Sequence, residues 1–300
     1  MIGLSAPPVV YALALLPAVL WGFAPVFSKR GMAAGGSPLQ ASLVVVAVDT
    51  GLYAVALAVL GGPSVLALDG RTVAIFAGAG LVGTALGRLA VFAGVERLGA
   101  SVNSAAISAR PLFAAAFAVG LLGERVTLPT LAGVVTLAAG LVRLALARGG
   151  DVRGWEPRDL AFPLTGAAFF ALGNVVRRHA LRATETTPLQ AVALNEAAAL
   201  VALGGYALVR TRGDVLNAPR RTYGFFAASG TLTAVALLAL FGALALPGGR
   251  VVVVDPLAAT APLFTAVFAH FLLDDFERVT RGVVVGATLI VVGAALVTVG

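Results

Sequence analysis

Nine polar side chains occur inside long apolar stretches of the sequence, where a polar group is costly and therefore informative. They are Asp49, Arg88, Asn103, Arg110, Asn174, Asn195, Glu196, Asp255 and His270. Such side chains either pair with one another and fix helix packing, or bind the charged ends of a solute. Asp49 and Arg88 lie on consecutive stretches, and we predict that they form an internal pair. For His270, a proton-coupling role and a plain hydrogen-bonding role are both open.

Arg110 is the strongest candidate for direct contact with a solute. It precedes Pro111 about halfway along an apolar stretch. Proline removes one intrahelical hydrogen bond and loosens the turn before it, which frees backbone carbonyl groups. Asp255 and Thr260 accompany prolines in the same way in a later stretch. These turns are predicted to bind a solute, and the alternative is a proline kink that only shapes the helix bundle.

Trp21 and Phe23 lie in the middle of the first apolar stretch, away from the interface where tryptophan usually collects. Tryptophan at this depth either lines a cavity that holds flat, apolar groups or packs in the protein core. The corresponding region of the second half supplies Phe169 and Asn174. The residues predicted to bind substrate are therefore Trp21, Phe23, Arg110, Asn174, Phe169, Asp255 and Thr260.

Several kinds of chemistry lack the residues they need. The chain has no cysteine, which excludes thiolate nucleophiles and thiolate metal sites. Its one lysine, Lys29, follows Ser28, so a phosphate-binding GxxxxGK loop cannot form. Residues 78–83 match GxGxxG but lie inside an apolar stretch with no preceding strand, and their glycines are expected to serve helix packing. No protease motif is present, and we predict neither catalytic residues, nor a cofactor, nor a metal.

The composition requires lipid as the solvent of most of the chain. Hydrophobic residues make up 59% of the 300 residues and charged residues only 12%, and the mean hydropathy is +0.98. A soluble domain of this size carries about twice that charged fraction. Ten stretches are long enough to cross a membrane as helices. They are residues 9–28, 39–60, 72–94, 101–122, 128–147, 160–178, 188–209, 222–246, 251–273 and 281–299.

The two halves of the sequence are repeats of one another. The tetrapeptide PLQA at residue 38 recurs 150 residues later, and ERVT at residue 124 recurs 153 residues later. The predicted domains are therefore 1–150 and 151–300, with five helices each. Because five is odd, the second repeat enters the membrane from the opposite side. The predicted fold is an all-α integral membrane protein of ten transmembrane helices in two inverted five-helix repeats, an architecture typical of transporters.

Several of these residues resemble a known family. Trp21-Gly22 with Lys29 at the end of the same helix is similar to the start of an EamA-type repeat. Pro111, followed by a Gly-Glu-Arg sequence at residue 123, resembles the later part of that repeat. Both halves contribute, and the whole chain resembles a ten-helix member of the drug/metabolite transporter superfamily. One branch of this superfamily is the bacterial aromatic-amino-acid exporter.

This resemblance implies a secondary transporter that exports small amphipathic metabolites, amino acids first, by alternating access between the two repeats. The alternatives are efflux of drugs or toxic compounds, and a non-transporting channel or scaffold subunit. The implied location is the bacterial inner membrane with both termini in the cytoplasm, although the distribution of arginines favours the opposite orientation. The expected partners are a small-molecule substrate and membrane lipid, with no nucleic acid. A monomer suffices because the repeat is internal.

Overall fold

The computed structural model describes residues 7–60, 68–122, 127–147, 149–151, 153–211, 217–249 and 251–299. Within these ranges the chain is almost entirely helical and crosses the membrane in ten segments, as predicted. Six segments are single helical runs of at least 18 residues that are apolar enough to cross a membrane, and three shorter apolar helices lie in the remaining crossings. The predicted all-α membrane fold is confirmed.

The described residues of the first repeat form eight helical elements. They are α1 (Pro8–Ala33), α2 (Pro38–Leu60), α3 (Gly70–Ala79), η2 (Gly80–Leu86), α4 (Gly87–Leu98), α5 (Ala100–Ile107), α6 (Arg110–Leu122) and α7 (Leu128–Ala145). The elements α3, η2 and α4 form one continuous crossing, in which η2 is a π-helix. A π-helix widens the helical turn locally and often occurs at functional sites. Asp69 caps the start of this crossing by accepting a hydrogen bond from the Thr72 backbone at 3.0 Å.

The second repeat follows a connection that contains β1 (Gly150–Asp151) and the short helix η3 (Pro157–Leu160). Its helices and its strand are α8 (Ala161–Ala183), α9 (Pro188–Thr211), α10 (Arg220–Ala245), α11 (Val251–Ala258), α12 (Ala261–Leu272), β2 (Glu277–Arg278) and α13 (Arg281–Val299). The strands β1 and β2 pair antiparallel, so the connection between the repeats is joined to the loop before the last helix.

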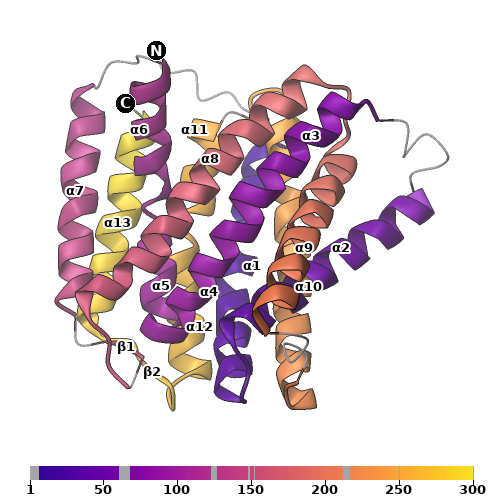
Figure 1. The fold of residues 1–300 in the computed structure, drawn as a ribbon. Coiled ribbons are helices and arrows are strands. Elements are labelled where there is room, and N and C mark those ends of the chain that lie inside the picture. Colours follow the sequence, from indigo (N-terminus) through magenta and orange to yellow (C-terminus); the bar gives the residue numbers. More distant parts are fainter. Residues whose placement is uncertain are drawn as a thin grey trace.

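The fifth crossings of the two repeats show the inversion directly (Figure 1). The helix α7 descends to β1 at the bottom of the view, whereas α13 starts beside β2 at the bottom and runs upward. These two helices pack along each other, and α1 packs along α10 in the same way. The repeats are therefore interleaved, and each buries its apolar faces against the other.

The fourth and ninth crossings, predicted as continuous stretches at residues 101–122 and 251–273, are each broken at the same relative position. A turn at residues 108–109 separates α5 from α6, and a turn at residues 259–260 separates α11 from α12. Pro111 and Pro262 are each the second residue of the helix after the break. The loosened turns that the prolines predict are therefore present, because a proline cannot donate the hydrogen bond that would continue the helix.

Close helix packing is confirmed at Gly83 and Gly87 but is wrong for Gly78, where a Cβ atom would meet nothing within 4 Å. A Cβ atom on Gly83 would meet Gly173 of α8 at 2.9 Å, and one on Gly87 would meet the ring of Phe170 at 2.7 Å. A Cβ atom on Gly286 would meet the backbone of α7 at 3.1 Å. These contacts leave no room for a side chain, which explains why small residues occur there.

Candidate functional site

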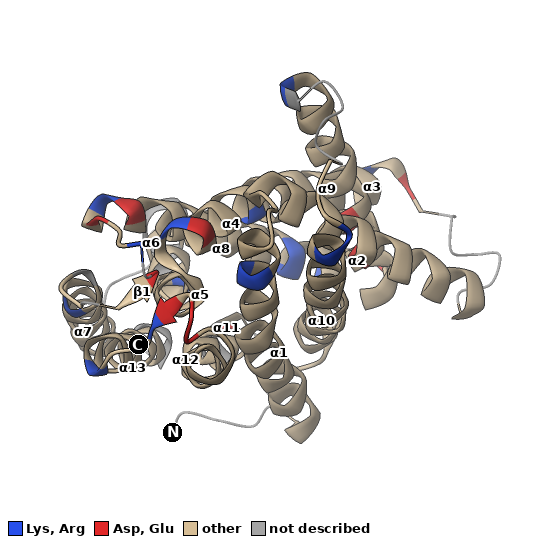
Figure 2. Cartoon of the chain, turned by 90° about the horizontal axis from the view of Figure 1, so that it is seen from below, with Lys and Arg blue, Asp and Glu red and all other residues tan. Residues whose placement is uncertain are grey.

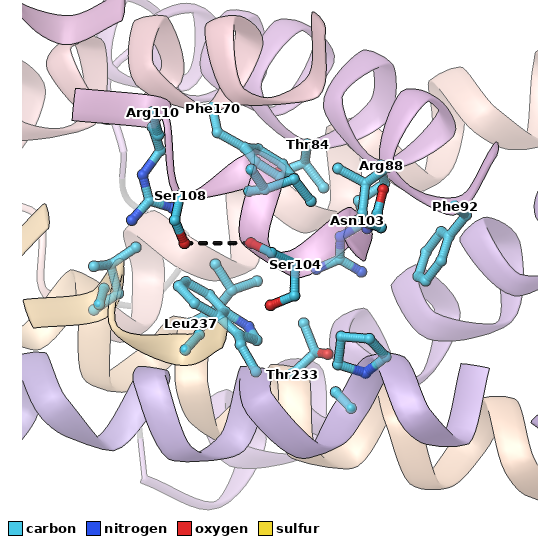
Figure 3. Close-up of a pocket in the computed structure, with 18 of the residues that line it drawn as sticks. Thr84, Arg88, Phe92, Asn103, Ser104, Ser108, Arg110, Phe170, Thr233 and Leu237 are labelled. Carbon is cyan, nitrogen blue, oxygen red and sulfur yellow. Dashed lines mark hydrogen bonds between the residues drawn. The ribbon is translucent and has the colours of Figure 1, made fainter. Parts of the chain in front are cut away.

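A cavity of about 140 Å³ lies between the two repeats. Figure 3 shows Arg110 and Ser108 at one end of it, Arg88 and Phe92 at the other, and Leu237 on the facing wall. The cavity is lined by residues of α1, η2, α4, the broken α5–α6 crossing, α8, α10 and the broken α11–α12 crossing. Their aromatic and aliphatic side chains include Trp21, Phe92, Phe170, Leu237 and Leu240. Apolar walls with a few polar groups are typical of sites for small molecules.

The predicted ion pair of Asp49 and Arg88 is present, and a second carboxylate joins it. The Nη2 atom of Arg88 lies 2.6 Å from Asp49 Oδ2 and 3.2 Å from Glu196 Oε2. Asp49 and Glu196 are fully buried and come from α2 and α9, while Arg88 extends from α4 to the cavity. One guanidinium thus balances two carboxylates from different repeats.

A second buried group connects this pair to α8. The hydroxyl of Thr84 donates to Glu196 Oε1 at 3.1 Å and accepts from Asn195 Nδ2 at 2.7 Å and Arg177 Nη2 at 2.9 Å. Arg177 also donates from Nε to Asn195 Oδ1 at 3.0 Å and from Nη1 to Asn174 Oδ1 at 2.9 Å. The π-helix η2 positions Thr84 for these contacts, and Gly80 allows η2 to approach the backbone of Asn195.

The network ends at the two broken crossings. Asn174 donates from Nδ2 to Asp255 Oδ1 at 3.0 Å, and Arg110 Nη2 lies 3.5 Å from the same oxygen. Arg110 is the first residue after the break in the fourth crossing, and Asp255 belongs to α11, just before the break in the ninth. A continuous line of buried polar side chains therefore runs from α2 through both repeats to these two turns.

Asn103 is a separate polar group in the same cavity. Its side chain is fully buried, and neither its oxygen nor its nitrogen has a hydrogen-bond partner. It lines the cavity from α5, close to Arg88 in the close-up of Figure 3. A buried amide without partners costs about 1–3 kcal/mol. Its position on the cavity wall suits it to hydrogen-bond a solute as both donor and acceptor.

Three of the predicted site residues, Trp21, Arg110 and Asn174, line the cavity. Asp255 reaches it through its contacts with Asn174 and Arg110. The other three lie elsewhere among the described residues. Phe23 packs edge-to-face on Phe27 and Phe268. The neighbour of Phe169, Phe170, lines the cavity instead of Phe169. The hydroxyl of Thr260 donates to the Leu257 carbonyl. His270 is exposed on the outer side of α12.

Sequence reasoning missed Thr84 and misplaced Arg177. The predicted stretch at residues 160–178 places Arg177 and Arg178 at its end. The helix α8 instead continues to Ala183, and both arginines are buried within it. The spacing of Asn174 and Arg177 held the missing signal, because residues three apart share one helix face. Because Asn174 is predicted to be internal, Arg177 on the same helix face should be internal as well.

A charged cluster lies beneath the cavity. Lys29, at the end of α1, forms an ion pair with Asp151 of β1 and donates to the carbonyl of the cavity residue Val95 at 3.3 Å. Arg153 also binds Asp151, with an Nε–Oδ1 distance of 3.1 Å. Seen from below, charged residues gather around β1 while the long helices are mostly uncharged (Figure 2). Lys29 is therefore buried, and it closes the cavity on the side of β1.

Glu277 of β2 completes this charged cluster. Its carboxylate accepts hydrogen bonds from the backbone of Ala100 and Ser101 and from the Ser101 hydroxyl at 2.7 Å. It therefore caps the start of α5, where the helix dipole favours a negative charge. Burial raises the pKa of Glu277, and the hydrogen bonds from Ser101 and Ala100 only partly oppose this. Burial would also raise the pKa of Asp151, but hydrogen bonds from Arg153 and Lys29 hold it below its usual value.

The family model of the EamA-like transporter family matches residues 9–146 and 160–299, which is most of the chain. The chain belongs to the EamA-like transporter family. The match consists of two copies, as the internal repeat requires. This EamA-like protein is therefore a multi-pass membrane transporter of small solutes, with membrane lipid as its surroundings. The exact division of the chain at residue 150 stays a prediction.

Known structures support the same fold. A solved structure titled "Crystal structure of protein" is 18% identical in sequence, with a TM-score of 0.65. The similarity covers 97% of this chain and 96% of that chain. A likeness at this level of identity shows the fold alone. A comparison with curated protein sequences gave no match.

Proposed function

We propose that this EamA-like protein exports small amphipathic metabolites, and that amino acids with aromatic or hydrophobic side chains are its main substrates. The cavity between the repeats carries this proposal. Its walls of Trp21, Phe92 and Phe170 suit an apolar side chain, while its charged and amide groups suit the polar end of an amino acid. A solute that is apolar at one end and charged at the other matches both surfaces.

Within this site, Trp21, Arg110 and Asn174 contact the substrate. Asp255 is a positioning residue, because it holds Arg110 and Asn174 through its Oδ1 atom. The broken turns on either side let backbone groups take part in binding, as in other transporters with interrupted helices.

Transport proceeds by alternating access. The interleaved packing of α1 with α10 and of α7 with α13 allows one set of helices to rock against the other. The ion pair of Lys29 and Asp151 closes the cavity on the side of β1 and must open for release on that side. The protein acts in the bacterial inner membrane with both termini in the cytoplasm, and a monomer contains both repeats.

Solute counterflow in proteoliposomes tests this proposal. Purified protein is reconstituted with unlabelled leucine or phenylalanine inside, and entry of the radiolabelled amino acid is followed against empty liposomes. We expect accumulation that saturates with concentration, and Arg110→Ala to abolish it. Arg143→Ala is the matched control, because Arg143 is exposed on α7. Absence of flux for every amino acid tested, or flux of lipophilic drugs alone, would overturn the proposed substrate class.

A further inference from the structure

Arg177 differs from the other two arginines of the cavity in its partners. Arg88 contacts Asp49 and Glu196, and Arg110 faces Asp255. Arg177 is 2% exposed, and its three nitrogens donate to Asn195, Asn174 and Thr84, all of which are uncharged. Among the residues that the structure describes, it forms no ion pair with a carboxylate. A buried guanidinium is thus held in place without an anion of its own.

Such an arrangement is costly. A guanidinium stays charged at any pH that proteins tolerate, so it cannot escape burial by losing its proton. The penalty for burying a charge without a partner is several kcal/mol. Amide and hydroxyl oxygens offset part of this penalty and fix the direction of the guanidinium. Two of its five N–H groups remain after the three hydrogen bonds to Asn195, Asn174 and Thr84.

The side chain of Arg177 is also part of the cavity wall. Arg177 lines it together with two of its three hydrogen-bond partners, Thr84 and Asn174. The charged groups of the network balance in number, with Asp49, Glu196 and Asp255 against the three arginines. The charges are not evenly paired in space, because Arg88 contacts two of the three carboxylates, those of Asp49 and Glu196. The missing negative charge is therefore at Arg177, next to the space where a solute binds.

We propose that Arg177 binds the carboxylate of the transported solute, and that the protein is selective for carboxylates that carry an apolar group. A carboxylate accepts from the two free N–H groups and supplies the anion that the site lacks. Trp21, Phe92 and Phe170, which line the same cavity, then hold the apolar group. This inference rests on the proposed function, since it concerns the same cavity.

Four compounds of similar shape test it by binding. They are leucine, isocaproate, which lacks the amine, and leucinamide and isoamylamine, which keep the amine but lack the carboxylate. The chain has two tryptophans, and Trp155→Phe leaves Trp21 as the sole reporter in the cavity wall. In this background we expect leucine and isocaproate to change Trp21 fluorescence saturably. Leucinamide and isoamylamine should bind at least about tenfold more weakly.

Arg177→Gln should weaken binding of the two carboxylates at least about tenfold and leave the other two compounds unchanged. Arg178→Gln is the matched control, because Arg178 donates to the Leu244 carbonyl and should not affect binding. The comparison of leucine with leucinamide needs no variant, so it tests the selectivity for carboxylates even if Arg177→Gln does not fold. Equal binding of leucine and leucinamide, or no binding of either carboxylate, would overturn the role of Arg177.

Counterflow separates this inference from the proposed function. If leucine and leucinamide both exchange, and at equal rates, then transport stands and the carboxylate site is wrong. If Trp21 reports binding selective for carboxylates but no solute exchanges, then the carboxylate site stands and the proposed transport of amino acids is wrong.

Discussion

The guanidinium of Arg177 in the second repeat donates to the hydroxyl of Thr84 in the first, over 2.9 Å. The same hydroxyl accepts from Asn195 at 2.7 Å and donates to Glu196 at 3.1 Å. A threonine of the π-helix thus joins three polar side chains of α8 and α9. This contact holds the two repeats together at the depth of the cavity.

Thr84→Val should lower the stability of the protein by about 1–3 kcal/mol, because the buried donors of Arg177 and Asn195 lose an acceptor. Valine has nearly the same shape as threonine, so packing is preserved and the hydroxyl alone is tested. Thr84→Ser keeps the hydroxyl and should lose much less. Thermal unfolding in detergent measures both variants, and equal melting temperatures for the valine and serine variants would contradict this role.

Two glycines of the GxGxxG match should respond in opposite ways to alanine. A Cβ atom on Gly83 would meet Gly173 at 2.9 Å, whereas one on Gly78 meets nothing within 4 Å. Gly83→Ala should therefore destabilise the protein by roughly 1–3 kcal/mol through overpacking. Gly78→Ala should stabilise it by up to about 1 kcal/mol, because alanine favours the helix. Thermal unfolding of the two variants checks this, and a loss of similar size in both would show that packing at Gly83 is not decisive.

Removing Lys29 and removing Asp151, which form an ion pair, should lower the stability of the protein by different amounts. In Asp151→Asn, Lys29 stays buried with two backbone carbonyls and no carboxylate, at a cost of about 3–5 kcal/mol. In Lys29→Met, Asp151 keeps Arg153 at 3.1 Å, so the loss should be smaller. The double variant should recover part of the loss of Asp151→Asn, as a double-mutant cycle of unfolding measurements would show. Additive losses would mean that the two side chains do not act as a pair.

The raised pKa of Glu277 predicts a pH dependence of stability. The folded protein binds this proton more tightly than the unfolded chain, whose pKa is the ordinary 4.5. Stability should therefore fall as pH rises from about 4.5 to the shifted pKa, and Glu277→Gln should remove this decrease. The lowered pKa of Asp151 has the opposite effect, because it makes stability fall as pH decreases below 3.8. The pH ranges of the two effects therefore do not overlap. Thermal unfolding of both proteins across this range is the measurement, and the same slope in both would assign it to another group.

The sequence determined the membrane fold, because a chain with 12% charged residues can satisfy its backbone in lipid only by crossing as helices or as a closed barrel. Continuous apolar runs decided between the two. The odd number of helices in each repeat then required the inversion. Local rules also predicted the loosened turns before Pro111 and Pro262, since the effect of proline on the preceding turn needs no tertiary contact.

Only the tertiary structure decided which polar groups meet. Asp49 and Arg88 were paired from sequence because their helices are consecutive, but Glu196 is distant in the chain and joins them only through the packing of α9 against α2. Thr84 gives no signal in the sequence, since a threonine in an apolar helix usually bonds its own backbone. Arg177 lies at the end of the apolar stretch 160–178, and hydrophobicity alone does not show that the helix continues beyond it to Ala183. The hydrophobicity of a stretch is set by residues that are adjacent in the sequence. A hydrogen-bonded network instead depends on which faces of helices far apart in the sequence face each other in the fold.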